Sequence, residues 1–127
     1  MAHNIHHEHL IKEIEELLKP ILSSSPQAIY VYLDDTHKTC NKKFADMLGY
    51  KSPKEWISNQ YPVSDVDKKD QKKVIAAYMD ASRKFKAAVL TAALLRKDGK
   101  KVNTEIIMVP FTYQHEVSVL HFISKKK

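Results

Sequence analysis

The amino-acid sequence predicts an α+β fold with an N-terminal amphipathic helix, two strands, a group of helices and a three-stranded antiparallel meander. Three observations lead to this prediction. Apolar residues recur at helical spacing between positions 5 and 22, a β-branched and aromatic run covers positions 28–33, and Asp98 with Gly99 forms a hairpin-turn pair between two apolar runs. At 127 residues the chain has the usual size of one domain.

The N-terminal helix is predicted over residues 5–22 because its apolar side chains fall three and four positions apart, on one face. Pro20 is expected to end or kink this helix, because proline lacks the backbone N–H that an interior helical residue donates. The apolar face spans two short heptads, so it can form a dimer seam or pack on its own domain. The candidates for a dimer interface are Leu10, Ile14, Leu17, Leu18 and Ile21.

A strand, a turn and a second short strand are predicted next. Positions 28–33 form the first strand, two aspartates supply the turn, and positions 37–40 return as the second strand. Asn41 is then a helix N-cap, because its short side chain can accept a hydrogen bond from an N–H group of the first turn. The short helix ends at Leu48, and Gly49 follows at the position that favours left-handed backbone.

Two further helices are predicted before the meander. Ser52, Pro53 and Glu55 match a capping box with a first-turn proline, which indicates the start of another short helix. From Asp67 to Phe85 the apolar residues have helical spacing, and this predicts the main internal helix.

The meander is predicted from its first turn outward. The alanine-rich stretch at positions 87–95 is compatible with a helix or with a buried strand. We predict a strand, because the hairpin turn that follows requires strands on both sides, the second at positions 102–109. A third strand alternates over positions 117–123, and positions 111–116 form the connection.

The order of the elements and the residues at their joints resemble the PAS domain family over positions 26–124. Asn41, Gly49 and Tyr50 are similar to the family's asparagine-capped helix that ends in Gly-Tyr, and positions 95–99 are similar to its charged hairpin. The resemblance implies a five-stranded antiparallel sheet with helices on one face. It also implies a pocket or a packed core between the sheet and the long helix.

The domain organisation follows from the same resemblance. Positions 1–25 hold the N-terminal helix and its connector, positions 26–124 a single stand-alone PAS-like sensor domain, and positions 125–127 a basic tail. Many family members end their last strand in an Asp-Ile-Thr triplet that couples to a downstream helix. Here the triplet is Phe-Ile-Ser at positions 122–124, and no effector domain is expected in this chain.

Charge and cysteine content bear on the compartment and the partners. The net charge of +6 arises from dispersed lysines, with arginine only at Arg83 and Arg96, which favours a solvated basic surface over a nucleic-acid interface. Cys40 has no partner for a disulfide, and no apolar stretch reaches the length of a membrane span. We therefore expect a cytoplasmic protein without a membrane partner.

Cofactor chemistry finds little support in the sequence. Cys40 lies outside the motif in which flavin-binding family members carry their reactive thiol, so covalent flavin is disfavoured. Haem is disfavoured because positions 67–85 contain no histidine. Four histidines gather near the start of the chain: His3, His6, His7 and His9. We interpret them as an exposed terminal cluster and expect no metal site. The identity of a cofactor stays unknown.

A ligand pocket is the main candidate site. Six side chains can line one cavity if the strands and the main helix face each other, and the same side chains can equally fill a core. The pocket candidates are Tyr32, Cys40, Tyr78, Met79, Asn103 and His121. No catalytic residue is expected, since Cys40 and His37 point to opposite faces of a strand and the two glycines cannot form a phosphate loop.

The leading hypothesis is a non-enzymatic signal-transduction module that binds a small organic ligand, or a signalling protein in trans. Such a module would report through the docking of its N-terminal helix, and a homodimer is expected. The alternative is a purely structural homodimerisation module with a filled core. A third hypothesis is a nucleic-acid-binding accessory protein.

Overall fold

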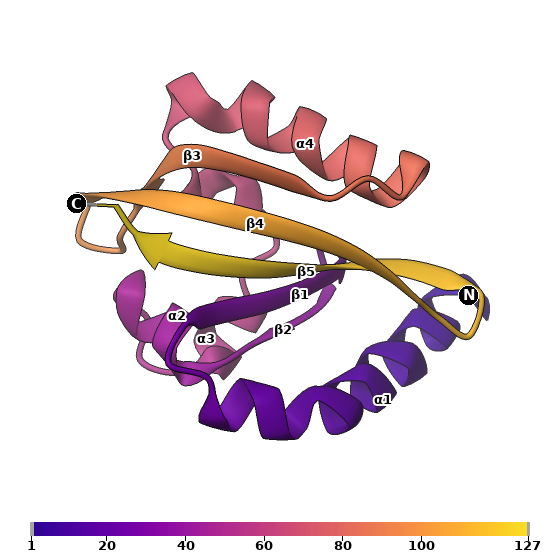
Figure 1. Ribbon diagram of the computed structural model, residues 1–127. Helices are drawn as coiled ribbons and strands as arrows, with labels where there is room; N and C mark the ends of the chain where they lie inside the picture. The colour runs from indigo at the N-terminus through magenta and orange to yellow at the C-terminus, as the bar shows by residue number, and fades with distance from the viewer. Residues whose placement is uncertain (1, 127) are drawn as a thin grey trace.

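The chain folds as a sheet with helices on both sides (Figure 1). The structure is a computed structural model that describes residues 2–126, with side chains from residue 6 onward. The elements, with η for a 3-10 helix, are α1 (Ala2–Ser24), β1 (Ala28–Asp34), β2 (His37–Cys40), α2 (Lys42–Met47), α3 (Pro53–Ile57), η1 (Pro62–Asp65), η2 (Lys68–Asp70), α4 (Gln71–Lys84), β3 (Ala88–Leu95), β4 (Lys101–Tyr113) and β5 (Glu116–Lys125). This order confirms the predicted succession of a helix, two strands, helices and a three-stranded meander.

The five strands form one antiparallel sheet in the order β2-β1-β5-β4-β3, which confirms the predicted fold class. The central strand is β5, between β1 and β4. Side chains alternate between the two faces of each strand. On β1, Tyr30 and Tyr32 therefore point to the inner face of the sheet, while Val31 and Leu33 point to the outer face.

Helices α2, α3 and α4 pack on the inner face of the sheet and enclose the main core. Asn41 caps α2 as predicted: its Oδ1 accepts hydrogen bonds from the backbone N–H groups of Phe44 and Ile29, which ties the helix start to β1. Ser52 caps α3, also as predicted. The largest fully buried apolar side chains of this core are Leu48, Trp56, Ile106, Met108 and Ile123.

Helix α1 packs on the outer face, over β1 and β2 (Figure 1). Leu10 and Ile14 are fully buried there, against Val31 of β1. The helix does not end at Pro20 but continues to Ser24. Because Pro20 is exposed, water can solvate the carbonyl group that the missing N–H leaves unpaired. Neither α1 nor any other helix within residues 2–126 is apolar over a sufficient length to cross a bilayer.

The main internal helix starts later than predicted. Helix α4 begins at Gln71, whereas the apolar spacing placed the start at Asp67. The intervening residues are bound to β3: the Asp67 N–H donates to the Ala93 carbonyl, and the Asp70 carboxylate accepts from the Ala93 N–H, both at 2.8 Å. These bonds hold the segment as a bridge and a 3-10 turn, so the α-helix forms only after them.

The last hairpin is tighter than predicted. Strand β4 extends to Tyr113, and the connection to β5 shrinks to Gln114 and His115, both of which have left-handed backbone. Two such residues suit the twist of a two-residue hairpin. Pro110 lies inside β4, at a point where β4 pairs with β5 but no longer with β3. A sheet tolerates proline at such an edge position.

Candidate functional site

A cavity of about 100 Å³ lies between the inner face of the sheet and the helices. Strands β1 and β5 contribute to one wall, and α4 with the segment between α3 and α4 forms the opposite wall. The lining is mostly apolar, and two carboxylates stand at its edge. Its aromatic members are Tyr30, Tyr32, Phe44, Trp56, Tyr78 and His121.

Four stacked or tilted rings form one continuous side of the cavity. Tyr30 on β1 stacks on His121 of β5, with ring centroids 3.9 Å apart and planes inclined by 10°, because the sheet register pairs these two residues. Phe44 from α2 and Trp56 from α3 contact the Tyr30 ring, at centroid distances of 4.8 Å and 5.2 Å. The side of the cavity is thus built from two helices and two strands.

His121 is the buried titratable group of the cavity. Its Nδ1 lies 3.2 Å from the Val119 carbonyl oxygen, which can only accept, so Nδ1 carries the proton. Burial lowers the pKa of His121 to about 3. The imidazole is therefore neutral at physiological pH and contributes an uncharged aromatic surface to the cavity.

Asp35 and Asp65 supply the polar edge of the cavity. The Tyr32 hydroxyl donates to Asp35, and the Tyr50 hydroxyl donates to Asp65 at 2.9 Å. Burial raises the pKa of Asp65 although hydrogen bonds from Tyr50 and Asn59 oppose the rise. Burial also raises the pKa of Tyr32. Carboxylate acceptors at this edge suit a ligand that donates hydrogen bonds.

Three of the six predicted pocket residues, Tyr32, Tyr78 and His121, line this cavity. The others lie elsewhere. Met79 is exposed on α4, and Asn103 is exposed on the side of β4 that faces away from the core. The apolar spacing of α4 predicted that Met79 faces the sheet. Only some of the apolar side chains of α4 contact the sheet, and Met79 is not one of them.

Cys40, the sixth candidate, is buried in the main core and does not line the cavity. Burial raises the pKa of Cys40 to about 12, and the charge of nearby Glu15 adds to the rise. Its side chain is therefore a protonated thiol at neutral pH, and a protonated thiol is a poor nucleophile.

Other cavity residues were not singled out from the sequence. Trp56 is the single tryptophan of the chain and directly follows the predicted capping box. A lone large aromatic residue at the start of a predicted helix is a signal that could have identified it as a core or cavity residue. Asp65 lies in η1, a segment without hydrophobic periodicity, and nothing in the sequence indicates that it reaches the cavity.

The five predicted dimer-interface residues of α1 divide into two groups. Leu10 and Ile14 are buried against the chain's own sheet, so they are not available to a partner while α1 is docked. Leu18 is half-buried at the margin of the same contact. Leu17 and Ile21, in contrast, are 58% and 44% exposed.

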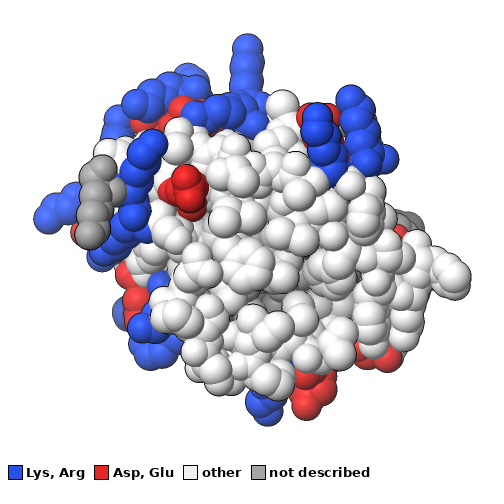
Figure 2. Space-filling view, viewed as in Figure 1, with Lys and Arg blue, Asp and Glu red and all other residues white. Residues whose placement is uncertain are grey.

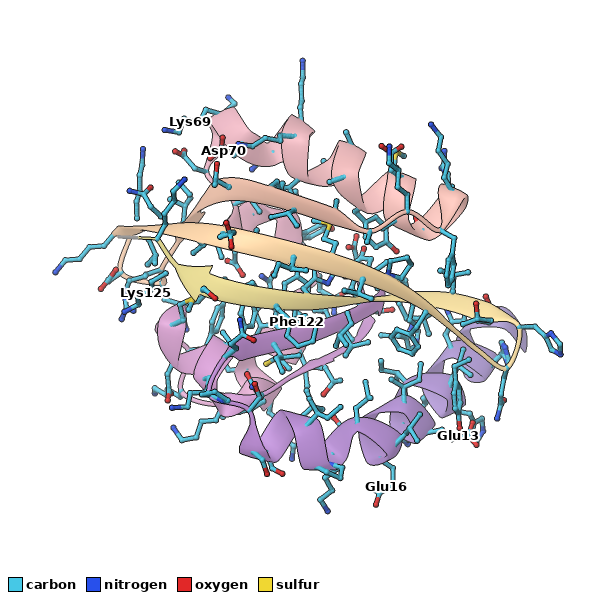
Figure 3. All side chains as sticks on the ribbon, viewed as in Figure 1. Glu13, Glu16, Lys69, Asp70, Phe122 and Lys125 are labelled. Atoms are coloured by element: carbon cyan, nitrogen blue, oxygen red, sulfur yellow. The ribbon has the colours of Figure 1, made fainter. Side chains whose placement is uncertain are left out.

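The outer face of the sheet beside α1 is apolar and carries few charges. Figure 2 shows a broad uncharged surface in the middle of this view, with lysines gathered at its margins. Val89 on β3 is 67% exposed, and Val109 on β4 is exposed as well. Phe122 lies on β5 within this surface, whereas Glu13 and Glu16 project from the side of α1 away from the sheet (Figure 3).

The N-terminal histidines differ from the predicted exposed cluster. His6 and His9 are exposed as expected, and the side chain of His3 lies outside the described residues. His7, however, is only 6% exposed, because it packs against the turn between β1 and β2. The interpretation as an exposed terminus is therefore wrong for His7.

Comparison with known proteins gives the same fold. A family described as PAS domain matches residues 16–78 of the sequence, and no curated protein sequence matches the chain. The PAS domain of a Colwellia psychrerythraea protein superposes with a TM-score of 0.70 at 19% identity, covering 89% of this chain and 97% of that chain. The PAS domain of nitrogen regulation protein NR(II) from Vibrio parahaemolyticus gives a TM-score of 0.64 at 15% identity, over 87% and 98% of the two chains.

A longer relative contains the same fold as one part. An RNA-binding light-oxygen-voltage receptor superposes with a TM-score of 0.61 at 16% identity over 78% of this chain, which spans only 29% of the receptor. An antiparallel five-stranded sheet with one helix-covered face is the fold that this chain shares with these domains. The chain belongs to the PAS domain family, whose general role is that of a sensor in signal transduction.

Proposed function

We propose that the chain is a sensory module that binds a small organic molecule in the aromatic cavity and does not catalyse a reaction. The observation that carries this proposal is the cavity of about 100 Å³ between the sheet and α4. A mostly apolar lining with a few convergent polar groups is the usual lining of a small-molecule site, although this cavity is smaller than the usual range of about 300–1,000 Å³.

The size and the lining of the cavity indicate the class of ligand. An engineered protein cavity of about 150 Å³ holds benzene, so a cavity of about 100 Å³ suits a molecule no larger than a single small ring. Tyr30 and His121 offer flat aromatic surface, and Asp35 and Asp65 offer hydrogen-bond acceptors. We propose a compact, single-ring compound that carries a hydrogen-bond donor.

Strand β1 offers a route from the cavity to α1. Tyr30 and Tyr32 point into the cavity, and the alternating residues Val31 and Leu33 contact α1 on the other face. A ligand that shifts the two tyrosines would therefore change the surface on which α1 rests. The response would be a shift between two dockings of α1, driven by the difference in ligand affinity between them.

Native mass spectrometry and thermal unfolding test the ligand proposal. We expect a single-ring compound to be retained on purification, or a panel of such compounds to include one that raises the free energy of unfolding by about 2.7 kcal/mol at one hundred times its dissociation constant. Ile75→Trp, which fills the mouth of the cavity, should abolish this effect. Met79→Trp, one turn further along α4 and outside the cavity, should preserve it.

Two results would contradict the ligand proposal. The first is a protein of bare chain mass that no compound of the panel stabilises. The second is an equal loss of stabilisation in the two tryptophan variants. The first result would favour the alternative of a structural dimerisation module, and the second would place the bound compound outside the cavity.

We also propose that the chain forms a homodimer through the outer face of the sheet and the exposed part of α1. The exposure of Leu17, Ile21 and Val89 supports this proposal. So does the broad uncharged surface in Figure 2, because monomers rarely leave contiguous apolar patches open to water. Leu17→Glu should convert the dimer to a monomer in analytical ultracentrifugation. Lys19→Glu, at an exposed position on the opposite side of α1, should leave the dimer intact. A wild-type protein that stays monomeric at all concentrations would refute the proposal.

A further inference from the structure

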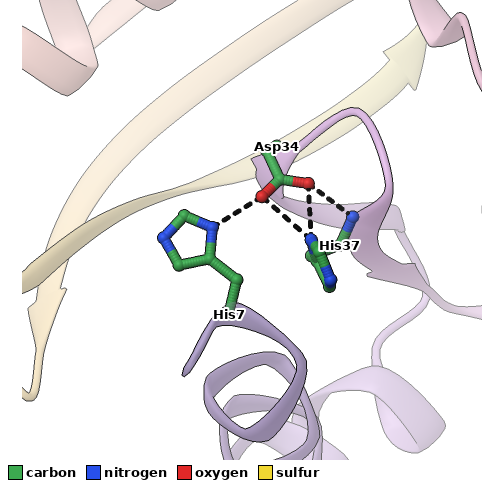
Figure 4. Close-up of side chains that lie close together, drawn as sticks. All are labelled: His7, Asp34 and His37. Carbon is green, nitrogen blue, oxygen red and sulfur yellow. Dashed lines mark hydrogen bonds and ion pairs between the residues drawn. The ribbon is translucent and has the colours of Figure 1, made fainter. Parts of the chain in front are cut away.

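Three side chains from two distant parts of the sequence meet where α1 crosses the turn between β1 and β2 (Figure 4). His7 comes from α1, Asp34 ends β1, and His37 begins β2. The Nδ1 atom of His7 lies 2.6 Å from Oδ2 of Asp34, and the Nδ1 atom of His37 lies 2.9 Å from the same oxygen. One carboxylate oxygen thus faces two imidazole nitrogens.

The turn itself holds Asp34 in this position. Its other oxygen, Oδ1, accepts hydrogen bonds from the backbone N–H groups of Thr36 and His37, at 2.9 Å and 2.8 Å, and from the Thr36 hydroxyl. The Nδ1 atom of His37 also lies 2.8 Å from Oδ1, so it bridges the two carboxylate oxygens (Figure 4). The turn thus anchors Oδ1, and Oδ2 faces both His7 and His37.

The spacing of the three groups is close to that of a metal site. Their ligand atoms all lie within 4.8 Å of one another. Ligands of a tetrahedral Zn²⁺ ion lie about 2.0–2.2 Å from the metal, and therefore about 3.3 Å from one another. The nitrogens of His7 and His37 lie 2.6 Å and 2.9 Å from Oδ2, so they need to move away from that oxygen by about 0.4–0.7 Å to reach this spacing.

A second carboxylate stands behind His7. Glu116 Oε1 lies 3.5 Å from Nε2 of His7, on the side of the ring opposite to the Nδ1 atom that faces Asp34. Metal-binding histidines usually have a carboxylate or carbonyl partner at their second nitrogen, which orients the ring and raises its basicity. Glu116 occupies that place.

We propose that His7, Asp34 and His37 bind one divalent transition-metal ion of the Zn²⁺ type, with Glu116 as the outer partner of His7. Imidazole and carboxylate ligands suit Zn²⁺ among the available ions. Asp34 is partly exposed, so water completes the coordination. His7 belongs to α1, and the other two ligands belong to the β1–β2 turn. The ion therefore links α1 to the sheet and stabilises the arrangement in which α1 packs on its outer face.

Calorimetric titration of Zn²⁺ into chelator-treated, dialysed protein tests this site. We expect one ion per chain in the wild type, and loss of this binding event in His37→Gln. Glu116→Gln should weaken the affinity by about 10–100-fold, as expected for an outer partner. His9→Gln is the matched control: His9 lies on the exposed side of the same helix, and its replacement should leave the affinity unchanged.

A second readout separates the ion from a general loss of structure. Circular dichroism without metal establishes that His37→Gln is folded, and hydrogen exchange then follows α1. Zn²⁺ should slow exchange in α1 of the wild type and of His9→Gln, but not of His37→Gln. The proposal is overturned if no ion binds, if binding persists in His37→Gln, or if His9→Gln loses it, since the last two results would assign the ion to the exposed terminal histidines. Ile75→Trp should bind Zn²⁺ normally, so this outcome is independent of the cavity ligand.

Discussion

Burial of the His121 imidazole makes the free energy of unfolding depend on pH. Its pKa is about 3 in the folded chain, because the imidazole is buried, whereas in the unfolded chain it has the ordinary value of about 6.5. Between these two values the unfolded chain binds one proton that the folded chain does not. The free energy of unfolding therefore falls as the pH decreases from about 6.5 toward 3.

We predict that replacement of His121 by asparagine removes this pH dependence. Asparagine retains an N–H donor for the Val119 carbonyl but does not titrate. The wild type should lose up to about 1.4 kcal/mol per pH unit below pH 6.5 relative to His121→Asn. Urea unfolding at about pH 7.5 and about pH 5 measures the two slopes. Parallel slopes would show that His121 titrates normally in the folded chain.

Lys38 is a second buried ionisable residue, and the sequence analysis did not single it out. Its ammonium group donates to the carbonyl oxygens of Asp35, Ile57 and Asn59, the last two at 2.9 Å and 2.7 Å. Burial lowers the pKa of Lys38, and the charge of Asp35 opposes this effect. The residue joins the β1–β2 turn to the end of α3.

The prediction for Lys38 concerns the carbonyl groups that it satisfies. Lys38→Met should lower the free energy of unfolding by about 2 kcal/mol, because it leaves partly buried carbonyl oxygens without this donor. Lys42→Met is the control, since Lys42 is exposed and its ion pair with Asp46 should contribute less than about 0.5 kcal/mol. Equal effects of the two substitutions in chemical denaturation would disprove the structural role of Lys38.

At the scale of elements, the apolar face of α1 is buried at Leu10 and Ile14 and exposed at Leu17 and Ile21. Ile14→Ala should cost about 3 kcal/mol at every protein concentration, because Ile14 is fully buried within the chain. Leu17→Ala should cost less than about 0.5 kcal/mol in dilute protein, where no dimer forms. Unfolding at several protein concentrations separates the two. A large loss for Leu17→Ala in dilute protein would place Leu17 in the chain's own core.

Elements with local signals were predictable, and their ends were less so. Asn41 and Ser52 cap helices because each side chain bonds to an N–H three residues away, a range that the sequence displays directly. The start of α4 was misplaced because Asp67 bonds to Ala93 of a later strand. A contact between residues so far apart leaves no mark on local periodicity.

At the scale of the whole molecule, α1 completes the fold by covering the part of the outer face that lies over β1 and β2. Removal of residues 1–24 would expose a layer of apolar side chains that includes Val31, Leu33, Phe111 and Leu120. We predict that the shortened chain binds a hydrophobic dye strongly and elutes as aggregates in size-exclusion chromatography. A monomeric shortened chain of unchanged stability would show that α1 is not required to cover the sheet.

The sequence by itself determined the fold class, the order of the elements and most of their caps and turns. These features depend on hydrophobic period and on hydrogen bonds within a few residues, such as those of Asn41 and of the turn at Gly99. The sequence also identified Tyr32, Tyr78 and His121 as candidates, on the condition that the strands and the main helix face each other as the PAS resemblance implies.

Only the tertiary structure decided what those side chains meet. His7 and Asp34 are 27 positions apart and meet because α1 folds back across the start of the sheet. The sequence pattern placed Cys40 and Met79 with the cavity residues. In the structure Cys40 lies in the core and Met79 lies at the surface. Periodicity gives the face on which a side chain lies, whereas the depth and the neighbours on that face depend on how separate elements pack.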